Sequence, residues 1–349
     1  MTLVSVIGDF FSSVAPVFYD VFDDISTHII ISDDSKQDSQ YARKFKEGVK
    51  NFCIEKNKNI TQHFVRIDED SGSAIDKACR YILENSKGDI YVNVSDGLAT
   101  LNTIMTQKLL NKGVKFISYD IFDNEYHIID QNGIIERKKA KPMSIKEHFL
   151  LKNSKILVYE DTGFAEKNKK LLIELFEKKL HRFNSFKKKL TQNTLNINDY
   201  QDIAKILNKL GIRTNKKELT LNKKTITGSL FEMYIYLKMK YLNFDDIMMG
   251  ALIEDEGVKN EFDMLIIKDN HLSVVECKFK DTLRNTETLL FKYAFLRKIL
   301  DYDSKSLIIS AAEVDEKYHF RAQLYGVGFV NVGDDKFTEK IKCFFEGQI

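Results

Sequence analysis

The residues with the clearest chemical signal lie in the stretch from Ser273 to Phe279, which reads SVVECKF. This stretch has the apolar composition of a buried strand, yet it contains Glu276 and Lys278, two residues apart and therefore on the same face. A carboxylate and an ammonium are costly to remove from water unless they are paired or bound to a metal. The stretch therefore predicts a site that holds both charges.

Further acidic residues precede this strand in the sequence. TGSLFEMYIYLKMKYL predicts a helix with Glu232 in its first half, and NEFDMLII predicts a strand that contains Asp263. Asp269 and Asn270 are a turn signal that joins this strand to the next one as a hairpin, and TETLLFKYAFLRKIL predicts a second helix. The order helix, strand, strand, helix, with acids on the first three elements, predicts one shared site.

These residue types suit the hydrolysis of a phosphodiester. Mg²⁺ or Mn²⁺ prefers oxygen ligands, which Asp263 and Glu276 supply from adjacent strands. Lys278 can orient or deprotonate the attacking water, or neutralise the charge that develops on phosphorus. Glu232 completes the metal shell directly or through a water, and the backbone carbonyl of Cys277 is a further candidate ligand. We predict catalytic roles for Glu232, Asp263, Glu276 and Lys278, and metal binding by Asp263, Glu276 and Cys277.

Several of these assignments have structural alternatives. An isolated E-x-K is often an exposed ion pair, and Asp263 alone could be a surface acid of an edge strand. Glu261 alternates with Phe262 and so shares the face of Asp263, as a ligand or as a support for one. Lys292 and Tyr293 on the following helix either approach the phosphate or pack against other elements. The fold decides among these alternatives.

The length and composition of the chain predict its domain count and its cellular compartment. The sequence has 349 residues, 43% of them hydrophobic, and only 2 prolines, which predicts two globular domains without low-complexity tracts. The 4 cysteines include no C-x-x-C pair, which disfavours a zinc site and a disulfide framework. The N-terminus lacks a basic region, and no apolar run approaches the roughly 18 residues that span a bilayer. We therefore expect a cytoplasmic protein without a membrane segment.

The first 141 residues predict a sheet of mainly parallel strands. Short apolar runs alternate with helical patterns near residues 38–57, 73–86 and 98–112, which is typical of βαβ units in a doubly wound sheet. The expected strands are LVSVIG, HIIIS, HFVRI, DIYVNV and KFISYD, followed by EYHIID and GIIERK as a closing hairpin.

Two loops of this sheet are candidates for ligand binding. Ligands of doubly wound sheets bind beyond the carboxyl ends of the strands, which here precede GDFFSSVAP and NVSDGLATLN. Neither loop reads G-x-G-x-x-G, so a nicotinamide or flavin dinucleotide is not expected. Both offer hydroxyl groups, glycine and a helix N-terminus, which together bind phosphate. The predicted ligand contacts are Asp9, Phe10, Phe11, Ser12, Ser13, Ser95, Asp96, Gly97 and Thr100.

Two of these contacts have alternatives as well. Asp96 could be only the N-cap of the helix that follows it. Phe10 and Phe11 could pack in the core, although adjacent aromatic rings in a loop also suit stacking on a base. The loops alone therefore favour a ligand that carries phosphate groups.

The second loop resembles that of a known family. Residues 93–97 read N-V-S-D-G, which is similar to the N-[VL]-[ST]-x-G loop after the fourth strand of the CARF domain, the CRISPR-associated sensor of cyclic oligoadenylates. Many CARF domains continue as G-G-T-[KR], whereas this chain has Asp96, Gly97, Leu98 and Ala99 and lacks the basic residue. The resemblance implies a Rossmann-like CARF domain over residues 1–141, with the ring size of its ligand left open.

The C-terminal pattern resembles a second family. G-S-x-x-E, N-E-x-D and E-C-K, in this order, are similar to the core of the α/β restriction-endonuclease-like PD-(D/E)xK nucleases. This resemblance implies a nuclease domain over residues 225–349, after a basic helical linker region over residues 142–224. Within residues 164–224, 16 lysines and arginines outnumber 6 acidic residues, a net charge of +10. Such a basic surface is either solvated helix surface or a means of drawing in phosphates.

The chain as a whole resembles the cyclic-oligoadenylate-activated ancillary nucleases of type III CRISPR defence. This resemblance implies a homodimer that binds one ring, with cyclic tetra-adenylate as the expected activator. It also implies metal-dependent cleavage of single-stranded DNA or RNA, or nicking of duplex DNA. A DNA-binding regulator without catalytic activity is the alternative, but it leaves the acidic residues and the lysine unexplained. A constitutive nuclease is a third hypothesis, and it leaves the first half unexplained.

Overall fold

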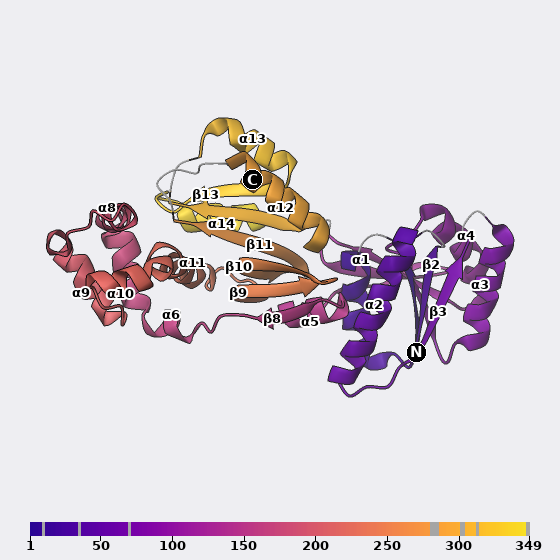
Figure 1. Ribbon diagram of the computed structural model, residues 1–349. Coiled ribbons are helices and arrows are strands. Elements are labelled where there is room, and N and C mark those ends of the chain that lie inside the picture. The colour runs from indigo at the N-terminus through magenta and orange to yellow at the C-terminus, as the bar shows by residue number, and fades with distance from the viewer. Residues whose placement is uncertain are drawn as a thin grey trace.

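The computed structural model of the chain describes residues 1–8, 11–33, 36–68, 71–279, 286–300, 304–311 and 314–346. Two sheets organise these residues, and helix α5 (Ile145–Leu151) lies between them (Figure 1). Among the helices in these ranges, none combines the length and the apolar character that a membrane span requires. We call the seven-stranded sheet with its covering helices the first domain, and the six-stranded sheet with its helices the second domain.

The first domain follows the predicted alternation of strands and helices. Its strands are β1 (Thr2–Ile7), β2 (Thr27–Asp33), β3 (Thr61–Ile67), β4 (Ile90–Asn93), β5 (Lys115–Asp120), β6 (Glu125–Asp130) and β7 (Gly133–Lys139). Its helices are α1 (Phe11–Asp20), α2 (Lys36–Glu55), α3 (Gly72–Asn85) and α4 (Ala99–Leu109), with short 3₁₀ turns at η1 (Phe22–Asp24) and η2 (Leu110–Lys112).

The strand order of the first sheet is β3-β2-β1-β4-β5-β6-β7. Strands β1 to β5 are parallel, and β6 and β7 return antiparallel as the predicted hairpin. Helices α1 and α2 cover one face and α3 and α4 the other (Figure 1), so Leu3 and Val4 bury against opposite layers. The chain order reverses between β1 and β4, which brings the two candidate ligand loops together at the switch point.

One expected loop is wrong. Residues 8–16 were expected as a loop up to Pro16, but α1 begins at Phe11 and contains that proline. Val14, Val17 and Phe18 are buried at helical spacing against the sheet, and this burial outweighs the helix-breaking tendency of the proline. Ser12 and Ser13 are therefore helical residues.

The second domain is built from a mixed sheet and two groups of helices. Its strands are β8 (Lys155–Val158), β9 (Asp246–Asp255), β10 (Val258–Lys268), β11 (His271–Lys278), β12 (Lys305–Ser310) and β13 (Val327–Asn331). The first group of helices is α6 (Gly163–Lys167), α7 (Lys169–Ile173), η3 (Glu174–Lys178), α8 (Leu180–Thr191), η4 (Ile197–Tyr200), α9 (Gln201–Lys209), α10 (Lys216–Leu221), η5 (Thr225–Ser229) and α11 (Leu230–Met239). The second group is α12 (Thr286–Leu300), α13 (Glu316–Leu324) and α14 (Phe337–Phe345).

The strand order of the second sheet is β13-β12-β11-β10-β9-β8. Strands β8 to β11 are antiparallel to their neighbours, and β11, β12 and β13 run parallel. Strands β10 and β11 form the predicted hairpin, and Asp269 and Asn270 at its turn have φ angles of 49° and 64°. Two successive positive φ angles are the mark of a type I′ turn, which matches the twist of the strands.

The segment 142–224, which we expected to be a helical linker region, divides into two parts in the structure. Strand β8 joins the edge of the second sheet, and helix α5 contributes Phe149 to the core of the second domain and Leu151 to that of the first. The basic helices share an apolar core with the second sheet, where the ring of Phe279 lies 5.3 Å from that of Phe176. Helices α8, α9 and α10 lie at the end of the second domain away from the first (Figure 1). Because their apolar faces pack in the same core as the second sheet, these helices belong to the second domain and do not form a linker between the domains.

Candidate active site and ligand loops

The β10–β11 hairpin brings Asp263 and Glu276 face to face. Met264 pairs with Val275, and the same antiparallel register continued by one residue sets Asp263 opposite Glu276. Directly opposite residues have Cβ atoms about 5 Å apart. Next to this pair, a side chain takes the place of a backbone acceptor between the two strands: the amide of Cys277 donates to Oδ2 of Asp263 at 2.7 Å. The two predicted ligand carboxylates therefore share one face of the sheet.

Glu276 is a buried carboxylate held by two partners. The side chain is 5% exposed, the ammonium of Lys278 forms an ion pair with its Oε1, and the hydroxyl of Tyr293 donates to its Oε2. Tyr293 comes from α12 and is itself fully buried. Of the two roles left open for this tyrosine, the structure supports packing, with the added function of fixing the orientation of Glu276.

Burial and neighbouring negative charge raise the pKa values of Asp263 and Glu232. Burial first, and then the charge of Glu276, raises the pKa of Asp263 to about 6. Burial first, and then the charge of Asp263, raises the pKa of Glu232 to about 7. Glu232 on α11 therefore lies close enough to Asp263 and Glu276 for their charges to affect its pKa. The three acids are crowded into a region where negative charge is costly.

Lys278 remains a cation in this surrounding. Burial opposes its charge, but the charge of Glu276 and the hydrogen bond to it outweigh burial and raise the pKa of Lys278. A lysine with a raised pKa is protonated at neutral pH. Of the roles predicted for Lys278, this favours orienting the water or neutralising charge on phosphorus over removing a proton.

Sequence reasoning missed a fourth acid, Glu160, which follows β8. Gly250 in β9 lies opposite Asp263 in the register and has a φ of 60°, and any Cβ at this position would overlap the side chain of Glu160. The amide of Glu160 also donates to the carbonyl of Met249 at 2.9 Å. The charge of Glu160 is one of the causes that raise the pKa of Glu232. The available signal was the glycine inside the apolar run IMMGALI, because a glycine in a strand often marks close approach of another chain segment.

Sequence reasoning also missed Lys187 of helix α8. This lysine belongs to the basic segment but is only 5% exposed, and its Nζ donates to the carbonyl of Phe279 at 2.7 Å. The same Nζ lies 3.8 Å from the centre of the Phe279 ring, which is a cation–π contact. Phe279 directly follows Lys278, so a lysine of the basic helices fixes the end of strand β11.

The remaining residues near the hairpin separate into core and surface. The side chain of Cys277 is buried in the apolar core, as predicted. The side chains of Glu261 and Lys292 are both exposed. The positive charge of Lys292 lowers the pKa of Asp263. These positions place Lys292 near the carboxylates and leave Glu261 as a solvated residue of β10.

The donor set fits a hard divalent cation. Buried carboxylates that face one another repel, and a cation between them removes this cost. In the part of the chain that the structure describes, no three His, Cys, Asp or Glu side chains gather closely enough to hold a metal alone. A cation at Asp263 and Glu276 would therefore keep waters or take substrate oxygens, as Mg²⁺ does in phosphoryl-transfer sites. The carbonyl of Cys277 stays a predicted ligand.

The two ligand loops of the first domain are joined by Asp96. Its Oδ2 accepts the amide of Gly8 at 2.8 Å, while Leu98 is the N-cap of α4 and provides no side-chain cap. The N-cap alternative for Asp96 is therefore wrong, since the carboxylate bridges the loops after β1 and β4. Gly97 has a φ of 81°, and a Cβ on it would lie 2.7 Å from Cγ1 of Val6. Glycine is thus needed here for packing within the domain.

The second loop is held by its own polar side chains. The hydroxyl of Ser95 donates to Oδ1 of Asn93 at 2.5 Å and accepts the amide of Tyr119 at 2.7 Å. Nδ2 of Asn93 and Oδ1 of Asn102 are buried without a hydrogen-bond partner in the described ranges. Thr100 is exposed in the first turn of α4. Orphaned buried polar atoms beside an uncapped helix N-terminus fit a ligand that carries phosphate or hydroxyl groups.

The first loop is only partly described. Asp9 and Phe10 lie outside the described residues. Ser12 is buried and its hydroxyl has no partner among the residues that are described, whereas Ser13 is half-buried. Phe11 packs edge-on against Phe45 and His148, with ring centres 6.0 and 5.0 Å apart. For Phe11, this packing supports the core alternative over base stacking.

Comparisons with known proteins bear on both domains. Residues 220–346 match the family model described as "Card1-like, endonuclease domain". This segment is therefore similar to Card1-like endonuclease domains. It contains Glu232, Asp263, Glu276 and Lys278. A comparison with curated proteins gave no match.

Two solved structures share the fold over almost the whole chain. Protein VC1899 from Vibrio cholerae superposes with a TM-score of 0.78 at 15% identity, covering 99% of this chain and 97% of that one. Can2 from Sulfobacillus thermosulfidooxidans, in complex with cyclic tetra-adenylate, gives a TM-score of 0.73 at 16% identity, with coverage of 99% and 98%. The fold class is the predicted one, a Rossmann-like sheet of mainly parallel strands followed by a second α/β domain. The Card1-like match and this fold together confirm the resemblance to type III CRISPR ancillary nucleases.

Proposed function

We propose that this chain is a metal-dependent nuclease of the PD-(D/E)xK type that a cyclic oligoadenylate activates. The observation that carries the proposal is the gathering of Glu232, Asp263, Glu276 and Lys278 around one hairpin inside the Card1-like segment. A regulator without catalysis has no use for buried acids that repel one another at a cost in stability.

The residues divide the chemistry of phosphodiester hydrolysis among them. Asp263 and Glu276 would hold Mg²⁺ or Mn²⁺, which supplies an activated water and polarises the phosphate when it is bound. Lys278, as a cation, orients the water or neutralises charge on the phosphate, and Tyr293 keeps Glu276 in place. Glu232 supports the site from α11.

The substrate is a nucleic acid, either single-stranded DNA or RNA, or duplex DNA that is nicked. The helices from α6 to α10 carry most of the net charge of +10 within residues 164–224 and share a core with β10 and β11. A positive surface beside the site raises the local concentration of a polyanion and its rate of association.

The first domain binds the activator at the loops after β1 and β4. The fold is that of Can2, whose structure was solved in complex with cyclic tetra-adenylate, and this ring is the ligand that we propose here. The groups that would receive its phosphates and riboses are Nδ2 of Asn93, Oδ1 of Asn102 and the uncapped N-terminus of α4. A two-fold symmetric ring implies two copies of the loops, so we propose a homodimer.

Cleavage assays with the purified full chain test this function. Labelled single-stranded DNA, RNA and supercoiled plasmid are incubated with Mg²⁺ or Mn²⁺, with and without each small cyclic oligoadenylate. We expect cleavage that needs both metal and ring, that is lost in Glu276→Gln, and that persists in Glu261→Gln. Glu261 is a matched control because it is an exposed acid on the same hairpin.

Other results would refute the proposal in different ways. Cleavage without any ring would favour a constitutive nuclease. Ring binding without cleavage of any substrate would favour a regulator. Full activity of Glu276→Gln would remove the active-site assignment.

A further inference from the structure

The turn of the catalytic hairpin is embedded in the first domain. Asn270 is 4% exposed, and its Oδ1 accepts the amide of Met143 at 2.7 Å. Its Nδ2 donates to Oδ1 of Asn124 at 2.9 Å and to the carbonyl of Lys141 at 3.0 Å. One side chain from the second domain thus makes three hydrogen bonds to the end of the first domain and the segment that leaves it.

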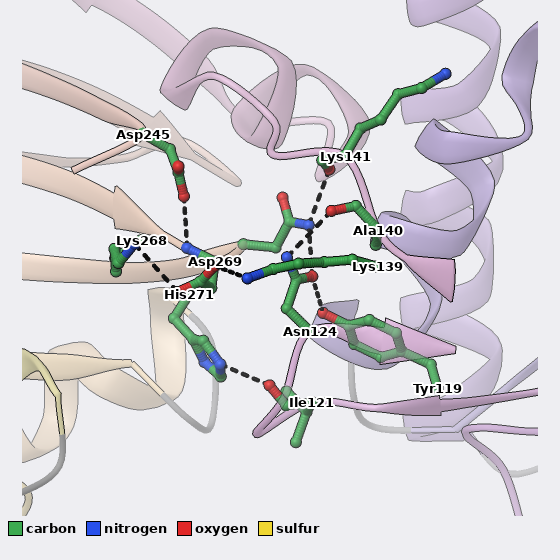
Figure 2. Close-up of polar contacts among 11 residues, drawn as sticks. Tyr119, Ile121, Asn124, Lys139, Ala140, Lys141, Asp245, Lys268, Asp269 and His271 are labelled. Atoms are coloured by element: carbon green, nitrogen blue, oxygen red, sulfur yellow. Dashed lines mark hydrogen bonds and ion pairs between the residues drawn. The ribbon is translucent and has the colours of Figure 1, made fainter. Parts of the chain in front are cut away.

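Neighbouring residues of the turn support the same contact. Figure 2 shows His271 beside Ile121 and Asp269 beside Lys139, across the junction of the two domains. Nε2 of His271 lies 2.7 Å from the carbonyl oxygen of Ile121, and Lys139 forms an ion pair with Asp269 at 3.2 Å. The turn is therefore held on both sides of Asn270.

A continuous set of hydrogen bonds leads from this turn to the ligand loop. Asn124 follows β5, and its Oδ1 accepts the hydroxyl of Tyr119 at 2.8 Å (Figure 2). The same Oδ1 also accepts Nδ2 of Asn270. The amide of Tyr119 donates to the hydroxyl of Ser95, which lies in the loop after β4. Every member of this set except Ser95 is buried. Because buried groups are closely packed, a displacement of the loop would be transmitted to the residues that they contact.

The hairpin extends this set to the catalytic residues. Strands β10 and β11 run from the turn to Asp263 and Glu276 without a break in their pairing up to Met264 and Val275. The distance along the strands from Asn270 is about 20 Å at roughly 3.3 Å per residue. A paired two-stranded segment moves as one body, so a tilt at its turn moves both carboxylates.

The residue type at the turn indicates more than a structural role. Position 270 has a φ of 64°, and glycine is the residue that such a position accepts with least strain. Asparagine tolerates this conformation and adds a side chain, and here that side chain is used entirely for contacts to the first domain and its connection.

We propose that Asn270 is a positioning residue that couples the ligand loop of the first domain to the catalytic hairpin. The inference rests on the proposed function, since it requires both a ring ligand and cleavage. Binding of the ring at the loop changes the place of Tyr119 and Asn124, and the hairpin follows through Asn270. The ring can act in this way only if it binds one arrangement of the junction better than the other.

The test replaces Asn270 by glycine in the full-length protein. Asn270→Gly keeps the turn and removes all three hydrogen bonds. Asn243→Gly is the matched control, because Asn243 is an exposed asparagine of the second domain with a φ of 59°. The readout is the ratio of the cleavage rate with saturating ring to the rate without ring. We expect this ratio to fall about tenfold in Asn270→Gly and to remain unchanged in the control.

A second variant keeps the test decisive if Asn270→Gly unfolds. Tyr119→Phe removes the hydroxyl that Asn124 accepts and should also lower the ratio, while circular dichroism reports folding. In the double variant of Tyr119→Phe and Asn270→Gly, the ratio should fall only as far as in the single variant with the larger fall, because both changes interrupt the same set of hydrogen bonds.

The outcomes separate the inference from the function. If the wild-type protein shows ring-dependent cleavage and both folded variants keep its ratio, the coupling role of Asn270 is wrong and the function stands. If both rates fall alike in Asn270→Gly, its role is structural only. If no ring alters cleavage by the wild-type protein, the proposed function fails and the coupling fails with it.

Discussion

Buried His28 makes the stability of the first domain depend on pH. The imidazole lies in β2 with no exposed surface, with Nε2 2.9 Å from the hydroxyl of Ser5 and the ring of Phe18 5.0 Å away. Burial lowers the pKa of His28 from 6.5 to about 3. Between these two values the unfolded chain binds a proton that the folded chain excludes.

The sign and the size of the effect follow from linkage. Because the unfolded state binds more protons in this window, stability rises with pH there and is lost as the pH falls below 6.5. Each pH unit is worth about 1.4 kcal/mol within the window. Acidification from pH 8 to pH 5 should therefore remove about 2 kcal/mol of the free energy of unfolding through His28 alone.

Urea unfolding at pH 8 and pH 5, followed by circular dichroism, measures this loss. Other groups titrate over the same range, so the quantity to compare is the pH-dependent loss in the wild-type protein against that in His28→Gln. Glutamine does not titrate and keeps a polar group near Ser5. The wild-type protein should lose about 2 kcal/mol more than the variant. Losses that agree within about 0.5 kcal/mol would refute the assignment of a neutral, buried imidazole.

Three further substitutions test the two sites. Glu276→Gln should abolish cleavage and leave ring affinity within about threefold by calorimetry, since the proposed activator site lies in the other domain. Glu160→Gln should move the acidic limb of the pH–rate profile to lower pH, because losing the Glu160 charge lowers the pKa of Glu232 and so keeps it ionised in more acidic solution. Gly97→Val should destabilise the first domain by about 2–4 kcal/mol in thermal unfolding, because of its positive φ and the approach to Val6.

Each of these predictions has an outcome that contradicts it. Loss of ring binding in Glu276→Gln would mean that the two sites are not separate. An acidic limb that stays in place in Glu160→Gln would remove Glu160 from the site. A Gly97→Val protein as stable as the wild type would show that the loop adjusts freely around residue 97.

Local patterns were enough to predict the β10–β11 hairpin. The period of two in β10 and β11 and the turn at Asp269 and Asn270 together fix which residues face one another. Asp263 and Glu276 could therefore be paired from the sequence. The strands of the first sheet were equally predictable, since each is a short apolar run bounded by turn or helix signals.

Contacts between distant segments could not be predicted in this way. Glu160 reaches the site because β8 pairs with β9 across the whole helical segment, and Lys187 does so because α8 packs against Phe279. Asp96 was predicted to contact the ligand, with a helix cap as the alternative, and its hydrogen bond to Gly8, 88 positions away, was not foreseen. Periodicity describes which face of an element is apolar, and it does not say which other element covers that face.

The placement of β8 has a consequence for how the chain is made. Strand β8 ends at Val158, and its partner β9 begins only at Asp246, while β12 and β13 follow later still. The strands of the first sheet all lie within residues 2–139, so that domain can fold while the ribosome is still translating the rest. The second sheet must close pairings between distant segments, which is slow and waits for the last strands. A ribosome-bound chain thus completes its first domain before its second, and a prematurely terminated chain lacks an assembled second sheet.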